Sequence, residues 1–118
     1  MPHRVLIIED DRDLSEALCA LLETLGHDVQ VAYSGGEGCE VARSFTPDVI
    51  ICDLSLPGIG GHETARILRG DPVTAQARLI ALSGDREALE QRRTIPDDFD
   101  SRLLKPVDGF ALERLLAS

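Results

Sequence analysis

Residues 5–11, with the sequence VLIIEDD, set an unbroken apolar run directly against three acidic residues. The run is continuous and rich in β-branched side chains, which is typical of a parallel strand buried on both faces. Its abrupt acidic ending places carboxylates at one end of that strand. We therefore predict a buried strand over Arg4–Ile8 whose carboxyl end carries Glu9, Asp10 and Asp11.

Apolar runs and amphipathic stretches alternate along the rest of the chain. The further runs that we expect to be strands are Val29–Ala32, Val49–Cys52, Leu79–Leu82 and Leu103–Leu104. The expected helices are Leu14–Leu25, Glu37–Phe45 with Ser34 as its N-cap, His62–Arg69, Arg86–Arg93 and one capped by Asp108. This alternation predicts an α/β fold, a doubly wound five-stranded parallel sheet with helices on both faces. For the strand order we expect the flavodoxin-like 2-1-3-4-5, which is common among such sheets.

Composition narrows the class of protein. A length of 118 residues predicts a single domain, 1–118. The net charge of −9 and an aromatic content of 3% argue against nucleic-acid binding, which depends on basic and stacking side chains. No apolar run approaches the roughly 20 residues of a membrane-spanning helix, so we expect no membrane contact. The three cysteines form no C-x-x-C pair, which favours a reducing compartment and a cytoplasmic location.

Polar residues follow the central strands at the point where each strand ends. Asp53 follows the third predicted strand, Ser83 the fourth and Lys105 the fifth. In an open parallel sheet, ligands bind beyond the carboxyl ends of the strands. One lysine cannot balance the carboxylates gathered there, and oxygen ligands suit Mg²⁺. A carboxylate beside a metal, a hydroxyl and an ammonium is equipped to attack phosphorus.

Four segments, in this order, resemble the receiver domain of response regulators in two-component (phosphorelay) signalling: 5–11, 50–58, 81–84 and 104–106. The resemblance covers nearly the whole chain. It implies that Asp53 is the phosphoacceptor and that Ser83 and Lys105 bind the phosphoryl group. It also implies a cis peptide bond before Pro106. The implied Mg²⁺ ligands are Glu9 (through water), Asp10, Asp53 and the backbone carbonyl of Ser55.

The resemblance further implies how the chain functions. A histidine kinase or histidine phosphotransfer protein passes a phosphoryl group to Asp53, and the acyl phosphate shifts the chain between two conformations. The altered surface then signals to a downstream protein or to an attached output domain. The chain is therefore expected to be a phosphorylated signalling domain rather than an enzyme, although it promotes its own Mg²⁺-dependent phosphorylation and dephosphorylation.

Some positions depart from the common receiver pattern. Arg102 stands where receivers often have Tyr or Phe, three residues before the lysine. Asp85 could influence hydrolysis of the phosphoryl bond or could cap a helix, and we favour the cap. We assign Arg102 and Asp85 to the switch or output surface. Pro96 shortens the fourth helix, so we expect a departure from the family geometry over Thr94–Asp98. The glycines of 58–61 are expected to form a flexible turn.

Competing functions remain open at this point. A protein-interaction module that no longer switches is favoured by Arg102 and Pro96. A phosphatase with an aspartyl nucleophile would want a second Asp two residues after Asp53, where this chain has Ser55. A flavodoxin would require a phosphate-binding Ser/Thr/Gly loop in place of the acids after the first strand. The sequence also fits both a free-standing regulator and a domain of a hybrid sensor kinase, which 99–116 resembles.

Overall fold

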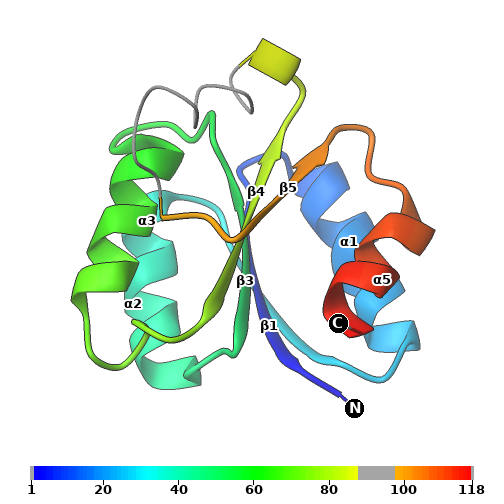
Figure 1. Ribbon diagram of the computed structural model, residues 1–118, viewed down its shortest axis with the longest axis horizontal. Helices are drawn as coiled ribbons and strands as arrows, with labels where there is room; N and C mark the ends of the chain where they lie inside the picture. The colour runs from blue at the N-terminus through cyan, green and yellow to red at the C-terminus, as the bar shows by residue number, and fades with distance from the viewer. Residues whose placement is uncertain (1, 88–97, 118) are drawn as a thin grey trace.

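The computed structural model describes residues 2–87 and 98–117. The strands are β1 (Arg4–Ile8), β2 (Asp28–Ala32), β3 (Val49–Asp53), β4 (Arg78–Ser83) and β5 (Ser101–Leu104), and the helices are α1 (Arg12–Thr24), α2 (Gly35–Phe45), α3 (Gly60–Gly70) and α5 (Gly109–Ala117). All strand pairings are parallel, in the order β2-β1-β3-β4-β5 (Figure 1). The predicted fold class and strand order are confirmed.

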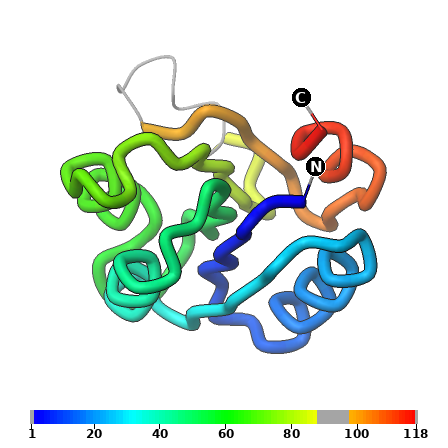
Figure 2. Tube along the Cα trace, turned by 90° about the horizontal axis from the view of Figure 1, so that it is seen from below, coloured from blue at the N-terminus to red at the C-terminus, as the bar shows by residue number. Residues whose placement is uncertain are grey.

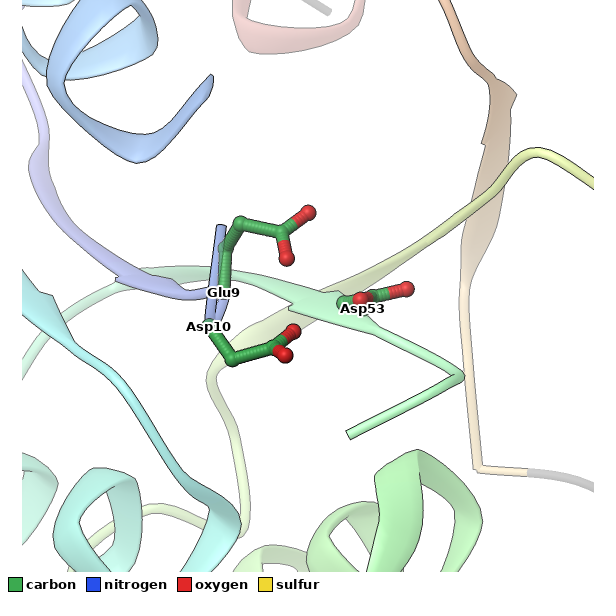
Figure 3. A group of neighbouring side chains, drawn as sticks. All are labelled: Glu9, Asp10 and Asp53. Atoms are coloured by element: carbon green, nitrogen blue, oxygen red, sulfur yellow. The ribbon is translucent and has the colours of Figure 1, made fainter. Parts of the chain in front are cut away.

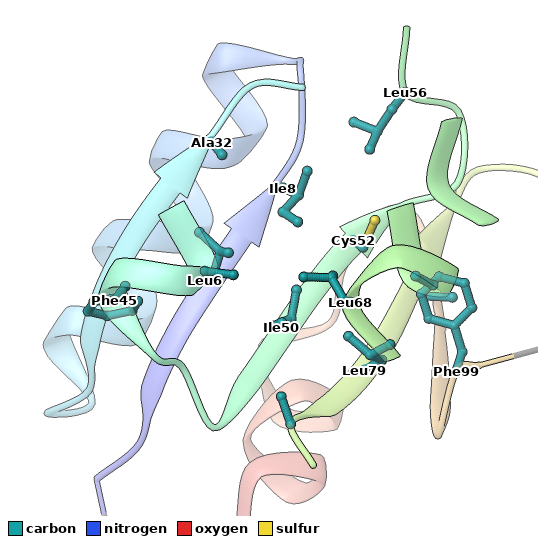
Figure 4. Packing of buried hydrophobic residues seen from close by; sticks show 14 residues of the cluster. Leu6, Ile8, Ala32, Phe45, Ile50, Cys52, Leu56, Leu68, Leu79 and Phe99 are labelled. Carbon is teal, nitrogen blue, oxygen red and sulfur yellow. The ribbon is translucent and has the colours of Figure 1, made fainter. Parts of the chain in front are cut away.

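The sheet separates two hydrophobic cores. Helices α1 and α5 cover one face and α2 and α3 the other (Figure 1). Along β1, Leu6 and Ile8 pack toward α2 and α3 (Figure 4), whereas Val5 and Ile7 pack toward α1 and α5. Because both faces are covered, alternate residues are equally buried, which explains the unbroken apolar runs. Each such side chain contributes roughly 1.5–3 kcal/mol through burial.

Helix boundaries follow local capping at some ends and tertiary packing at others. The predicted caps are present: Ser34 Oγ accepts from the Glu37 N–H, and Asp108 Oδ1 accepts from the Phe110 N–H. However, α2 and α3 each begin two residues earlier than predicted, at Gly35 and Gly60. Glycine is a poor helix former, so its low propensity hid these first turns, which packing against neighbouring elements stabilises.

Strand β5 is longer than its apolar pair indicated. Ser101 and Arg102 join it because they pair in register with Ile80 and Ala81 of β4. The predicted helix Arg86–Arg93 and the interruption at Thr94–Asp98 fall largely on 88–97, outside the described residues. No helix in the described ranges combines the length and apolar character needed to cross a membrane.

The strand order reverses direction at one point of the sheet. From β1 the chain winds outward to β2, then returns to place β3 on the other side of β1 (Figure 2). Loops leaving β1 and β3 therefore diverge at their carboxyl ends. This reversal is where open α/β sheets bind ligands.

Candidate functional site

Three carboxylates meet at this reversal. Glu9 and Asp10 follow β1 and Asp53 ends β3, and one oxygen of each lies within 4.8 Å of the others (Figure 3). The register explains the meeting, because Ile8 pairs with Cys52 and the next residues on both strands are acidic. Glu9 and Asp53 are only 1% and 3% exposed, whereas Asp10 is exposed. The cluster therefore opens to solvent on the side of Asp10.

A single ammonium faces these carboxylates. Lys105, the only lysine in the sequence, places Nζ 2.7 Å from Glu9 Oε1 and 3.5 Å from Asp53 Oδ2. Its backbone N–H donates to the Ser83 carbonyl at 2.8 Å, which fixes the end of β5 beside β4. The peptide bond between Lys105 and Pro106 is cis. One positive charge against three negative charges leaves the site with an excess of two.

Burial and this charge imbalance shift two pKa values in the site. Burial raises the pKa of Glu9 above 4.5, and the negative Asp53 adds to the rise, although Lys105 and the Asp11 N–H oppose it. Burial alone would lower the pKa of Lys105, but its contacts with Glu9 and Asp53 outweigh burial and raise that pKa above 10.5. The fold therefore holds the ammonium firmly charged beside carboxylates that repel one another.

The donor set fits a divalent cation. Glu9 Oε2 accepts from the Asp11 N–H at 3.1 Å, whereas the buried Oε1 accepts no hydrogen bond of ordinary geometry within the described part of the chain, despite its close ion pair with Lys105. Carboxylate oxygens with spare lone pairs, open to water on one side, match the preference of Mg²⁺ for few carboxylates and retained waters.

A hydroxyl lies on the strand next to Asp53. Ser83 ends β4 and is 1% exposed, and its Oγ accepts from the Asp85 N–H at 3.0 Å. Within residues 2–87 and 98–117, the one contact of its hydroxyl proton is a long one of 3.4 Å to the Asp85 carbonyl. The Asp85 carboxylate accepts from the Glu87 N–H at 2.9 Å, which is the capping role favoured from the sequence. The Ser83 hydroxyl can thus turn toward another acceptor.

The loop after β3 orients Asp53. The Ser55 N–H donates to Asp53 Oδ1 at 3.1 Å, and the Leu54 N–H donates to the Leu82 carbonyl at 2.9 Å. Gly61, in the first turn of α3, lies so close that a Cβ there would collide with the Asp53 carbonyl and the Leu54 backbone. Sequence reasoning assigned Gly61 to a flexible turn and missed this role, for which its local sequence carried no signal beyond the residue type.

The structure places Arg102 away from the strand ends. It lies within β5, in register with Ala81, and is half-buried. The structure thus brings Glu9, Asp10, Asp53 and Lys105 together. Ser55 lies on the loop after β3 and Ser83 ends the neighbouring strand β4, whereas Arg102 lies within β5 and Asp85 follows β4.

Comparison with known families agrees with this geometry. The family model for the response regulator receiver domain matches residues 5–117, so the chain belongs to this family of two-component signalling proteins. Response regulators transmit signals and are generally not classed as enzymes.

Curated relatives include two longer regulators. The chain is 34% identical over 114 residues to the DNA-binding dual master transcriptional regulator RpaA of Synechocystis sp., covering 97% of this chain and 46% of that protein. It is 35% identical over 109 residues to the transcriptional regulatory protein AfsQ1 of Streptomyces coelicolor, covering 92% and 47%. The chain therefore spans about half the length of these relatives.

Solved structures with the same fold include a putative response regulator from Chloroflexus aurantiacus, with 30% identity, a TM-score of 0.85 and complete coverage of both chains. The receiver domain of the sensor histidine kinase PA1611 from Pseudomonas aeruginosa has 25% identity and a TM-score of 0.84, covering 98% of this chain and 95% of that one. That structure has a magnesium ion coordinated in its active-site cleft.

Proposed function

We propose that residues 1–118 form one phosphoacceptor receiver domain, in which Asp53 takes a phosphoryl group from a histidine kinase or histidine phosphotransfer protein in a Mg²⁺-dependent reaction. The observation that carries this proposal is the meeting of Asp53 with Glu9, Asp10 and Lys105 at the carboxyl edge of the sheet. A lone buried aspartate would not be equipped for this chemistry, because nothing beside it would offset the charge of the incoming phosphoryl group.

The transfer forms one bond and breaks another. A carboxylate oxygen of Asp53 attacks phosphorus while the P–N bond to the donor imidazole breaks, and the electron pair of that bond stays on the imidazole nitrogen. The product on this chain is an acyl phosphate. The Ser55 N–H, bonded to Asp53 Oδ1, holds the carboxylate in one orientation, so Oδ2 on the Lys105 side is the better placed nucleophile.

Two side chains are suited to bind the phosphoryl oxygens. Lys105 Nζ lies 2.7 Å from Glu9 Oε1 and already within 3.5 Å of Asp53 Oδ2. A small rotation of the side chain would therefore bring the ammonium to an oxygen of a phosphoryl group on Asp53. The Ser83 hydroxyl can donate a second hydrogen bond once it leaves its long contact with the Asp85 carbonyl. Such donors stabilise the charge that develops during phosphoryl transfer.

The carboxylates of Glu9, Asp10 and Asp53, with the backbone carbonyl of Ser55, are the groups that would hold Mg²⁺. When bound, the ion neutralises their mutual repulsion and polarises the phosphoryl oxygens. This assignment is supported by the exposed Asp10 and by Glu9 Oε1, which within the described residues has an ion pair with Lys105 but accepts no hydrogen bond of ordinary geometry.

The same contacts couple phosphorylation to the surface. Ser83 and Lys105 end neighbouring strands and share a backbone hydrogen bond, so a new group on Asp53 acts on β4 and β5 together. We place Arg102 and Asp85, which lie on these elements, at the surface that signals to a downstream protein or an attached output domain. The charge of −9 supports a domain that does not itself bind nucleic acid. We further propose that the domain acts in the cytoplasm without membrane contact.

Incubation with Mg²⁺ and acetyl phosphate tests the proposal. Mass spectrometry should detect one added phosphoryl group, which EDTA prevents and which Asp53→Asn abolishes. The matched control Asp48→Asn, immediately before the start of β3, should be phosphorylated like the wild type. An adduct that persists in Asp53→Asn would overturn the assignment.

The switch has its own test. Beryllofluoride, which mimics the phosphoryl group, should shift amide NMR signals in β5 and α5 as well as at the site. Changes confined to the acidic cluster would instead identify an interaction module that does not switch.

A further inference from the structure

One exposed arginine near the carboxyl edge of the sheet stacks on an aromatic ring. The guanidinium carbon of Arg12, the first residue of α1, lies 4.0 Å from the centre of the Tyr33 ring. Across residues 2–87 and 98–117 this guanidinium forms no ion pair and no side-chain hydrogen bond. Its N–H donors are therefore oriented by the ring and still available to an anion.

Helix stability does not account for a cation at this position. The start of a helix carries the positive end of its dipole, so a positive side chain there is unfavourable. The acidic residues that suit this position are also present: Asp11 caps the helix and Asp13 lies in its first turn. Arg12 therefore carries its charge against the local preference.

Topology places this charge beside the carboxylate cluster. The Glu9 N–H donates to the Ala32 carbonyl at the end of β2, and Tyr33 is the next residue along the chain. Arg12 is two residues beyond Asp10, so their Cα atoms are at most about 7.6 Å apart. Charges on residues this close in the chain lie within about two Debye lengths of roughly 8 Å at physiological ionic strength, so an anion near Asp10 experiences a partly screened attraction to Arg12.

The proposed reaction needs such a charge. A phosphodonor is anionic, and it must approach three carboxylates on a chain of net charge −9. Lys105, the ammonium in the site, is engaged with Glu9 and largely covered. We propose that Arg12, held on the ring of Tyr33, is a steering residue that attracts the phosphoryl group of the phosphodonor to the acidic edge of the sheet.

This inference rests on the proposed function and deepens it. Arg12 takes no part in making or breaking bonds. A stacked guanidinium presents the planar pair of donors that suits phosphoryl oxygens, and its charge raises the local concentration of the anion. The ligand is the phosphoryl group itself, so donors with different leaving groups should both be affected, the donor with the greater net negative charge more strongly.

The experiment compares the second-order rate constants for phosphorylation of Asp53 in wild type and Arg12→Gln. Acetyl phosphate serves as a donor with a P–O bond and phosphoramidate as one with a P–N bond, both with Mg²⁺ present. We expect Arg12→Gln to react about threefold to tenfold more slowly at low ionic strength and less than about twofold more slowly at 1 M salt. Arg114→Gln, which makes the same charge change on the last turn of α5, should match the wild type.

Further readouts separate steering from a structural role. Tyr33→Phe keeps the aromatic ring and should be phosphorylated at the wild-type rate. Tyr33→Leu removes the ring, so its phosphorylation at low ionic strength should fall between the rates of wild type and Arg12→Gln. In Arg12→Gln, Mg²⁺ should bind slightly more tightly because a repelling charge is gone. Hydrolysis of the acyl phosphate by neutral water should be unchanged. A merely structural role would weaken Mg²⁺ binding and phosphorylation together.

The outcomes distinguish the two proposals. If the wild type is not phosphorylated on Asp53, the proposed function fails. If the wild type is phosphorylated but Arg12→Gln reacts equally fast at low salt, or if only one donor is affected, the steering role is wrong and the proposed function stands.

Discussion

The two edges of the sheet treat charged side chains in opposite ways. At the amino edge, Asp48 Oδ1 accepts from the Arg4 N–H at 3.0 Å, and the backbone of Asp48 bonds to both Arg4 and Arg78. At the carboxyl edge, three carboxylates share the one ammonium of Lys105. Polar groups at the first edge are satisfied by the protein, whereas those at the second are left in need of a ligand.

A histidine pair adds to the contrast. The His3 N–H donates to His27 Nδ1 at 2.9 Å, the two rings stack with centres 5.5 Å apart, and His3 Nε2 lies 2.7 Å from the Leu116 carbonyl. These contacts join the start of β1 to the end of α5, which lie side by side (Figure 2). Neither ring is near the strand ends that carry the carboxylates. The amino edge satisfies its charged groups within the protein, whereas the carboxyl edge keeps an excess of negative charge that lowers stability, as the proposed function would require.

Removing the ammonium should have the largest effect. Lys105→Met leaves the buried Glu9 carboxylate beside two other negative charges, and we expect the free energy of unfolding to fall by about 2–3 kcal/mol at pH 7. Urea titration measures this loss. The loss should be smaller at pH 5, because a further rise in the pKa of Glu9 lets protonation remove the unpaired charge.

An exposed ion pair provides the control for this variant. Arg66 and Glu63 lie 3.3 Å apart with side chains 75% and 47% exposed. Arg66→Met should change stability by less than about 0.5 kcal/mol. Equal losses for Lys105→Met and Arg66→Met, or a loss for Lys105→Met that does not depend on pH, would contradict the contrast between the edges.

The same substitution at the two ends of β3 should change stability in opposite directions. Asp53→Asn keeps an acceptor for the Ser55 N–H and removes a negative charge from a cluster that remains net negative, so stability should rise by about 0.5–1 kcal/mol. Asp48→Asn weakens the contacts with Arg4 and His3, so stability should fall by about 0.5–1 kcal/mol. Chemical denaturation without Mg²⁺ compares the two variants. A fall in both would show that the carboxylates at the carboxyl edge do not repel one another.

Lowering the pH should change the free energy of unfolding least. The contributions of His27 at the amino edge and Glu9 at the carboxyl edge should change in opposite directions. Burial lowers the pKa of His27 below 6.5, so the imidazole takes up a proton more readily in the unfolded chain than in the folded one. The stability that the neutral His27 ring contributes is therefore lost as the pH falls below about 6.5. The loss should not exceed about 1 kcal/mol, the worth of the hydrogen bond from the His3 N–H. Glu9 has a raised pKa, so its contribution instead improves as the pH falls toward 4.5.

Unfolding measured between pH 7 and pH 5 tests the histidine effect. His27→Asn keeps an acceptor for the His3 N–H but cannot titrate, so its stability should fall less than that of the wild type. Glu9→Gln is the matched variant at the carboxyl edge: it removes the gain that protonation of Glu9 brings, so its stability should fall more than that of the wild type as the pH is lowered. If wild type and His27→Asn lose the same stability between pH 7 and pH 5, protonation of His27 is not the cause of the loss.

Much of the site could be anticipated because strands end abruptly in this sequence. A change from apolar to acidic residues marks Glu9 and Asp53 as strand ends, and parallel strands bring their carboxyl ends to one edge. The pairing of Lys105 with Glu9 in preference to Asp53 could not be anticipated in this way. It depends on differences of less than an ångström between side chains more than 50 residues apart.

The positions and burial of the strands, the fold class and the polar residues at the strand ends could be predicted from the sequence, because hydrophobic period and strand ends are local properties. The tertiary structure alone decided that Gly61 must lack a side chain beside Asp53, that His3 bonds to His27, and that Arg12 rests on Tyr33. These contacts join residues from different elements. Their distances follow from how helices and strands pack, which no local run of residues specifies.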